Sequence, residues 1–174
     1  MAYIIVGLGN PGSEYENTRH NTGRMVADAY AEVAGKKAKV ITPDSFMNVT
    51  GKAIATKVKN PKKLIVVYDD FNLPLGSIRI SYNRSAGGHN GLASIIKALK
   101  TEEFTRVRMG VAPTTPGGKI KVPHGNGAIE KFILGEFKEA EMKVIKKMIK
   151  TAVEAIDMII DESKEKAMSV FNGK

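Results

Sequence analysis

The segment from Tyr3 to Leu8 is a continuous apolar run rich in β-branched residues, without alternation of polar and apolar side chains. A strand with this pattern is buried on both faces, which is typical of a sheet that helices cover on both sides. A second run of this kind, Leu64 to Tyr68, follows the turn-forming pair Asn60-Pro61. Two doubly buried strands favour a fold in which helices are layered on a largely parallel sheet.

The remaining segments show alternating strand and helix patterns. Ser77 to Tyr82 and Thr105 to Val111 alternate as partly exposed strands do. Helices are expected from Met25 to Val33, ending before Gly35, from Met47 to Val58, from Gly91 to Leu99 and over residues 138–161. The expected fold is one α/β domain of residues 1–174, a three-layer α/β/α sandwich with a mixed, mostly parallel central sheet.

The segment from Pro113 to Ala128 is rich in proline and glycine and poor in apolar residues. This composition predicts a long irregular segment at the surface. Because loops of such length often close over active sites, residues 113–128 are expected to form a surface or lid loop.

The chain carries a formal charge of +9 and has a pI near 9.6. Excess lysine and arginine favours a polyanionic partner such as nucleic acid, although many proteins are lysine-rich only for solubility. The absence of cysteine excludes a thiol nucleophile, a disulfide framework and a cysteine metal site. No apolar run approaches the roughly 20 residues that span a bilayer, and the first residues lack a secretory signal. We therefore expect a cytoplasmic protein with no membrane partner.

The motif Gly7-Leu8-Gly9-Asn10-Pro11-Gly12 has the letters of a dinucleotide fingerprint and follows a buried strand. In a dinucleotide fold a helix opens at these glycines, and an acidic residue ends a second strand about 20 positions later. Here the helical pattern begins only near Asn21, and the acidic residues Asp28 and Glu32 fall inside it. Nicotinamide or flavin binding is therefore a remote alternative, and no cofactor is expected.

Two His-Asn dipeptides, His20-Asn21 and His89-Asn90, each precede a predicted helix. Asparagine is a favoured N-cap residue, so helix capping alone explains one such dipeptide. The alternative is that these histidines and asparagines have functional roles.

Asp69 and Asp70 follow the second buried run, at the edge where open α/β sheets bind their ligands. Asn10 ends the first strand and lies at the same edge, which the loop leading to His20 can also reach. One carboxylate can orient a histidine and stabilise its charged form. A magnesium site and a solvated turn are the competing interpretations of the two aspartates.

Several catalytic motifs do not occur in the chain. It has no Gly-x-Ser-x-Gly elbow, no His-Glu-x-x-His helix and no P-loop, and it lacks cysteine. Covalent serine or cysteine catalysis and zinc catalysis therefore lack candidate residues. A water nucleophile activated by histidine remains, so residue types and spacing indicate a basic α/β protein with a candidate His–Asp hydrolytic site.

Five spaced segments form a more specific pattern. They are Gly7 to Gly12 with Tyr15, Thr18-Arg19-His20-Asn21 and Gly23; Pro43 to Gly51 with Phe46-Met47-Asn48; Asp69 to Gly76 with Leu73-Pro74; Gly87 to Leu92; and Phe104 to Gly110 with Arg106 and Arg108. Together they resemble the motifs of the bacterial peptidyl-tRNA hydrolase family, and they occur in the family's order over nearly the whole chain.

The resemblance implies an esterase that hydrolyses the ester bond of peptidyl-tRNA with histidine-activated water and releases free tRNA and peptide. It implies that His20 is the catalytic base, that Asp69 orients it, and that no metal takes part. The substrate-binding residues that it implies are Asn10, Tyr15, Asn48 and Asn90. It also implies a monomer whose partner is peptidyl-tRNA, with no obligate protein partner.

The chain departs from the family pattern in two places. Between Gly35 and Pro43 it is much shorter than typical members, which have an additional strand pair there. The family's tRNA phosphate clamp contains a lysine where this chain has Ser81. The phosphate-binding residues implied for this chain are Arg108, with Arg79 or Arg84 compensating for that lysine.

A non-catalytic RNA-binding protein is the main alternative, because the family has chloroplast relatives that act in intron splicing. Retention of His20 and Asp69 does not exclude this alternative. A partner-binding relative is expected to expose an apolar surface patch, and the sequence shows no obvious one.

Overall fold

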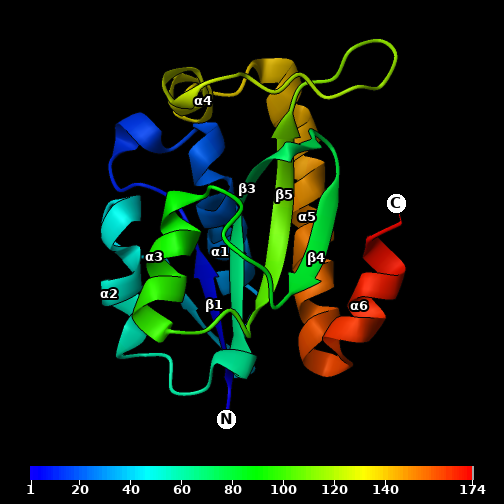
Figure 1. The fold of residues 1–174 in the computed structure, drawn as a ribbon. Helices are drawn as coiled ribbons and strands as arrows, with labels where there is room; N and C mark the ends of the chain where they lie inside the picture. The colour runs from blue at the N-terminus through cyan, green and yellow to red at the C-terminus, as the bar shows by residue number, and fades with distance from the viewer. Residues whose placement is uncertain (174) are drawn as a thin grey trace.

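The computed structural model describes residues 1–173, in which five strands form one sheet. The strands are β1 (Tyr3–Gly7), β2 (Ala38–Ile41), β3 (Leu64–Pro74), β4 (Ile78–Tyr82) and β5 (Thr105–Ala112). Their order across the sheet is β2-β1-β3-β5-β4 (Figure 1). β1 is parallel to β2 and β3, and β3 is parallel to β5, whereas β4 is antiparallel to β5. The expected mixed, mostly parallel sheet is confirmed.

Helices cover both faces of the sheet, as expected for three layers (Figure 1). One face is covered by α1 (Thr22–Ala31), α5 (Glu139–Asp161) and α6 (Lys164–Phe171), and the other by α2 (Thr50–Ala55) and α3 (Asn90–Leu99). The helix α4 (Asn126–Ile133) lies beyond the end of β5, at the top of Figure 1. Short 3-10 helices span Ser13–Tyr15, Arg19–Asn21, Met47–Val49 and Pro61–Lys63. Within residues 1–173, no helix is long and apolar enough to cross a membrane.

Two apolar cores lie between these layers, because successive residues of a strand point to opposite faces. In β3, Ile65 and Val67 belong to the core beneath α1 and α5. Val66 and Tyr68 belong to the core beneath α2 and α3. Both faces of β3 are therefore covered, which explains its apolar sequence without alternation.

The strand β5 is buried along its whole length, so the expectation of partial exposure is wrong for this strand. Its two arginines are buried and hydrogen-bonded. Arg106 donates to the carbonyl oxygens of Glu102 and Phe104, and Arg108 donates to Asp70. The alternation in the sequence therefore reflects bonded polar side chains and not exposure to solvent.

Two predicted boundaries are wrong. β3 does not end at Asp69-Asp70 but continues to Pro74, with a shift in its register against β5 between Asp70 and Pro74. The regular parallel register is interrupted after Asp70 and resumes only with Pro74 opposite Ala112, so both aspartates still lie at the carboxyl end of the regularly paired strand. The expected loop over residues 113–128 is shorter, because α4 already begins at Asn126.

The shortened segment after Gly35 still supplies one strand, β2, which pairs in parallel with β1 at one edge of the sheet. At the other edge, Asn172 donates to the Ile80 carbonyl oxygen at 2.8 Å and accepts from the Ile80 amide at 2.7 Å. These bonds occupy backbone groups that an edge strand otherwise exposes. The sequence pattern does not predict α6, because a helix of 8 residues spans little more than two turns.

Candidate active site

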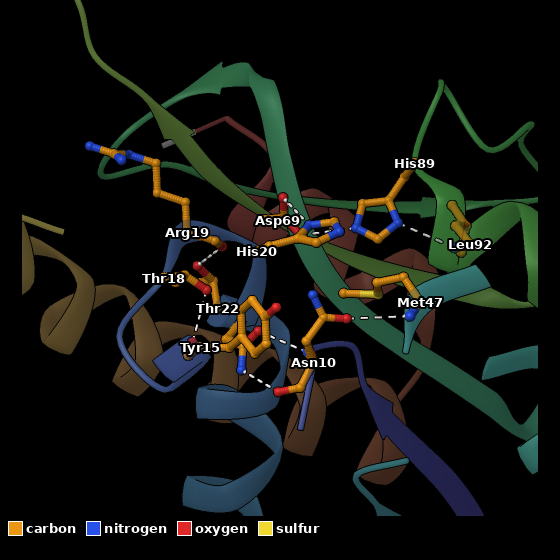
Figure 2. A network of polar contacts seen from close by, with 11 residues as sticks. Asn10, Tyr15, Thr18, Arg19, His20, Thr22, Met47, Asp69, His89 and Leu92 are labelled. Atoms are coloured by element: carbon orange, nitrogen blue, oxygen red, sulfur yellow. Dashed lines mark hydrogen bonds and ion pairs between the residues drawn. The ribbon is translucent and has the colours of Figure 1, made fainter. Parts of the chain in front are cut away.

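Two histidines and an aspartate meet at the carboxyl edge of the parallel sheet (Figure 2). His20 lies on the 3-10 helix Arg19–Asn21, Asp69 lies on β3, and His89 is the N-cap residue of α3. His20 Nδ1 is 3.0 Å from each carboxylate oxygen of Asp69, and His89 Nε2 is 2.9 Å from Asp69 Oδ1. All three side chains are buried. The structure thus brings the predicted pair together and adds His89 to it.

The hydrogen bonds determine where the protons of the neutral histidines lie. The Leu92 amide donates to His89 Nδ1 at 3.2 Å, so the proton of His89 is on Nε2 and is donated to Asp69. A carboxylate only accepts, and His20 Nδ1 therefore also donates to Asp69. This leaves a lone pair on His20 Nε2, which receives no hydrogen bond from any residue in the described range 1–173.

Burial and charge act in opposite directions on the pKa values of this cluster. Burial lowers the pKa of His20, but the charge of Asp69 and its hydrogen bond outweigh burial, so the pKa is raised above its usual 6.5. Burial raises the pKa of Asp69, but His20 and His89 outweigh it and hold this pKa well below its usual range. Asp69 is therefore ionised at neutral pH, where it strengthens His20 as a base.

Asn10 follows β1, and its side-chain amide is oriented by the backbone of Met47 (Figure 2). The Met47 amide donates to Asn10 Oδ1 at 3.3 Å, which leaves the Nδ2 group of Asn10 as a donor. Asn21 holds the backbone of Asn10 through two hydrogen bonds of 2.9 Å, one accepted and one donated. Asn21 makes no side-chain capping bond in the described helix α1, so the capping interpretation is wrong for this residue.

The capping interpretation is half right for His89-Asn90. His89 and not Asn90 occupies the N-cap position of α3, and its side chain accepts from the Leu92 amide. The same ring donates to Asp69 through its other nitrogen. One signal could have revealed the bond from His89 to Asp69. His89 precedes a predicted helix, and that helix begins near the sheet edge where the buried Asp69 lies.

A cavity of about 550 Å³ is lined by His20, Asp69 and His89. The three predicted asparagines, Asn10, Asn48 and Asn90, also line this cavity. Its apolar walls are formed by Phe46, Met47, Phe71, Ile129, Ile133 and Leu134. Tyr15 is not among the lining residues; its ring packs edge-on against Phe46, with the ring centroids 6.2 Å apart. We call this space the catalytic cavity.

A second hollow, of about 240 Å³, adjoins the catalytic cavity. Arg84 and Arg108 line it, and it shares Asp69, Phe71 and His89 with the cavity. Two of the three predicted phosphate-binding arginines are therefore close to the cluster of histidines.

Arg108 is held in place by two side chains. Its Nε donates to Asp70 at 2.8 Å, and its Nη1 donates to Ser81 at 3.2 Å. Ser81, at the position where the family pattern has lysine, thus supports Arg108. Arg79, the third predicted arginine, is exposed on β4 directly opposite Arg108 on β5. Residues directly opposite in an antiparallel pair share one face, so the two guanidinium groups lie on the same side of the sheet.

The two adjacent aspartates serve different partners. Asp69 accepts from the histidines, whereas Asp70 accepts from Arg108 and from the Asn72 amide at 2.8 Å. One side-chain atom from each of His20, Asp69 and His89 could act as a metal ligand, and these three atoms lie within 4.8 Å of one another. One nitrogen of each histidine already hydrogen-bonds to Asp69, so these ligand atoms are engaged with one another through the carboxylate.

The glycines of the first motif allow α1 to pack closely on the sheet. A Cβ atom at Gly7 would lie 2.4 Å from the Gly23 carbonyl oxygen, and one at Gly23 would lie 2.1 Å from the Val67 carbonyl oxygen. α1 begins only at Thr22, after the 3-10 helices. No α-helix opens at Gly7, Gly9 or Gly12, and the dinucleotide interpretation lacks its structural basis.

A mostly parallel sheet with a His–Asp pair and a cavity at its carboxyl edge defines a hydrolytic enzyme of the α/β class. The model of the peptidyl-tRNA hydrolase family matches residues 4–174. The chain belongs to this family, and the resemblance seen in the sequence motifs is confirmed.

Individual relatives agree over the length of the chain. The peptidyl-tRNA hydrolase of Caldanaerobacter subterraneus subsp. tengcongensis is 42% identical, with 98% of this chain and 100% of the relative covered. That of Carboxydothermus hydrogenoformans is 39% identical, with 98% of each covered. The crystal structure of peptidyl-tRNA hydrolase from Acinetobacter baumannii superimposes with a TM-score of 0.84 at 25% identity, covering 97% of this chain and 93% of that one.

Proposed function

We propose that this chain hydrolyses the ester bond of peptidyl-tRNA and releases free tRNA and peptide. The observation that carries the proposal is the environment of His20. Its Nδ1 donates to Asp69, and its Nε2 has no hydrogen-bond partner among residues 1–173. The His20 side chain lines the catalytic cavity. This arrangement suits a general base that activates water, and family membership supplies the substrate class.

In the proposed reaction, His20 Nε2 takes a proton from water while the water oxygen attacks the ester carbonyl carbon. The imidazolium that forms is stabilised by Asp69, 3.0 Å away. When the tetrahedral intermediate collapses, the bond to the ribose oxygen breaks, and the imidazolium returns its proton to that oxygen. The peptide and the tRNA are then released, and His20 is again neutral.

The asparagines have complementary roles in this proposal. Asn10 keeps Nδ2 as a donor because Met47 occupies its Oδ1, so Asn10 suits the negative oxygen of the tetrahedral intermediate. Asn48 and Asn90 line the same cavity and can bind the amide groups of the peptide. Tyr15 supports Phe46 at the wall of the cavity, where the terminal nucleoside of the tRNA can stack.

We propose that the second hollow and the adjacent face of β4 and β5 bind tRNA phosphates. Arg108 and Arg84 line the hollow, and Arg79 lies opposite Arg108. Two like charges directly opposite each other on a sheet repel, and a bound phosphate relieves that repulsion. Asp70 neutralises part of the charge of Arg108, so Arg79 and Arg84 are the more available cations.

The deciding experiment measures release of free tRNA from an N-acetylated aminoacyl-tRNA by the purified protein. We expect hydrolysis, with multiple turnovers and no added cofactor. Binding of the substrate without release would instead support the non-catalytic RNA-binding alternative.

We also propose that the protein acts in the cytoplasm as a monomer, without a metal, an organic cofactor or an obligate protein partner. The absence of cysteine supports a reducing compartment, and the formal charge of +9 supports a nucleic-acid substrate. Sedimentation of the purified protein at several concentrations tests the monomer directly.

A further inference from the structure

The helix α4 forms one wall of the catalytic cavity but is weakly attached to the fold. The cavity-lining residues that it and its C-cap supply are Asn126, Ile129, Glu130, Ile133 and Leu134. All 8 residues of α4 are described, and none of them is buried. An isolated helix of this length is unstable in water, so its position depends on specific contacts.

Arg19 makes several of those contacts at the C-terminal end of α4. Its Nη1 donates to the Phe132 carbonyl oxygen at 3.2 Å, and the guanidinium carbon lies 4.5 Å from the centroid of the Phe132 ring. Its Nη2 is 3.3 Å from Glu141 of α5, and its side chain is only 11% exposed. A desolvated cation at the negative end of a helix dipole, stacked on an aromatic ring, is a favourable arrangement.

Backbone hydrogen bonds join the same two segments. The Arg19 amide donates to the Gly135 carbonyl oxygen at 3.1 Å, and the Phe137 amide donates to the Asn17 carbonyl oxygen at 3.1 Å. The residue that follows Arg19 in the chain is His20, whose ring points away from the Arg19 guanidinium (Figure 2). One short segment therefore carries the base on one side and holds the cavity wall on the other.

We propose that Arg19 is a positioning residue that fixes the helix α4 relative to His20, so that the catalytic cavity has a defined wall when the substrate binds. The part of this proposal that concerns substrate rests on the proposed function. Arg19 acts through α4 and not on the base, because the hydrogen bonds that orient the His20 ring come from Asp69. Its loss is therefore expected to weaken substrate binding more than catalysis.

The test uses Arg19→Gln in the full chain. Because the backbone bonds of residues 17–19 remain, we expect the variant to fold, with amide hydrogen exchange in α4 at least tenfold faster than in the wild type. With N-acetylated aminoacyl-tRNA, we expect KM to rise about tenfold, kcat to change less than about threefold, and the pH profile of kcat to be unchanged. Arg19→Lys keeps the charge but not the planar guanidinium group. Its exchange rate in α4 and its KM should lie between those of the wild type and Arg19→Gln.

Arg24→Gln is the matched control, because Arg24 is also a partly buried arginine that donates to a backbone carbonyl, that of Pro43 at 3.2 Å. We expect it to leave exchange in α4 and KM unchanged. Should Arg19→Gln fail to fold, Phe132→Leu removes the nearer of the two rings beneath the guanidinium, the other being that of Phe137, and should give the same changes in smaller size.

Unchanged exchange in α4 in these variants would overturn the proposal. Faster exchange with an unchanged KM would overturn the role of α4 in binding, and a loss confined to kcat would indicate a structural effect on the base. Hydrogen exchange does not require turnover. If the wild type itself hydrolyses nothing, the proposed function fails while the anchoring of α4 by Arg19 is still measured.

Discussion

The Nδ1 atom of His20 lies at the same distance, 3.0 Å, from both carboxylate oxygens of Asp69. This contact fixes the orientation of the ring and the nitrogen that carries the proton. It also raises the pKa of His20 above its usual 6.5, because the carboxylate outweighs the effect of burial. The two residues therefore behave as one base, and their properties are expected to change together.

The pH dependence of activity is the first prediction. The base acts only when neutral, so wild-type kcat/KM should fall as pH decreases through an apparent pKa above 6.5. In Asp69→Asn, burial remains and the carboxylate is lost, so the pKa of His20 should fall. We expect the acid limb of the profile to shift to lower pH while the maximum rate decreases. An acid limb that stays in place, or moves to higher pH, would show that Asp69 does not set this pKa.

The loss of the base itself is the second prediction. His20→Ala should lower kcat by about 10² to 10⁴, the usual scale for removal of a positioned general base. His124→Ala, at an exposed histidine of the long loop, is the control and should retain full activity. Thermal unfolding of both variants should stay cooperative. A His20→Ala enzyme with wild-type kcat would remove this residue from the mechanism.

The sequence predicts much of the site, because the carboxyl edge of a parallel sheet is defined by its topology. Asn10 and Asp69 each follow a doubly buried run, and this alone places them near each other. The role of His89 is not predictable in this way, since strand topology does not show that its ring reaches Asp69. The contact of Arg19 with Phe132 joins residues 113 positions apart, and side-chain contacts at such separations leave no periodic signal.

The errors in the predicted fold have a similar cause. In the sequence, the arginines of β5 have the pattern of exposed positions. In the structure they are buried, because Asp70 and nearby carbonyl oxygens accept their hydrogen bonds. The glycines on either side of Asn126 hide the start of α4, which tertiary contacts stabilise more than helix propensity does. Local pattern therefore predicts elements with apolar repeats, and it fails where polar partners or distant contacts determine burial.

The third prediction concerns metal ions. The carboxylates of Asp69 and Asp70 are each engaged by side-chain partners, so we assign them no ion. A chelator should leave the rate of hydrolysis unchanged when monovalent salt keeps the tRNA folded. Loss of activity that added magnesium restores would favour the magnesium interpretation of these aspartates.

The fourth prediction concerns the phosphate contacts. Affinity for tRNA should decrease with salt, and Arg79→Gln should reduce the slope of log affinity against log salt by about one, as expected for one lost phosphate contact. Arg108→Gln should also weaken binding, but it should lower the thermal stability as well, because it leaves Asp70 buried without its partner. Lys36→Gln, at the amino end of the opposite sheet edge, should leave the slope unchanged. A wild-type slope in Arg79→Gln would show that Arg79 contacts no phosphate.

The last prediction concerns discrimination between peptidyl-tRNA and free aminoacyl-tRNA. A peptide presents a neutral amide next to the ester, whereas a free aminoacyl group presents an ammonium that must lose water in the cavity. The Nδ2 group of Asn10 can donate to a carbonyl or an oxyanion, but it offers no acceptor to an ammonium. An unpaired buried charge is costly, so the wild type should cleave an N-acetylated aminoacyl-tRNA far faster than its free counterpart.

Asn10→Asp tests this account with little change of shape. The variant keeps an acceptor for the Met47 amide and replaces the Nδ2 donor with a carboxylate oxygen. That oxygen repels the developing oxyanion, and we expect kcat on the N-acetylated substrate to fall by about 10² to 10³, the scale reported for one lost oxyanion donor. It also accepts from an ammonium, so the free substrate should lose less and the ratio of the two kcat/KM values should shrink. Asn60→Asp, at a surface N-cap, should keep the wild-type ratio. If Asn10→Asp slows both substrates equally, Asn10 serves catalysis alone, and discrimination depends on Asn48, Asn90 or the wall that α4 provides.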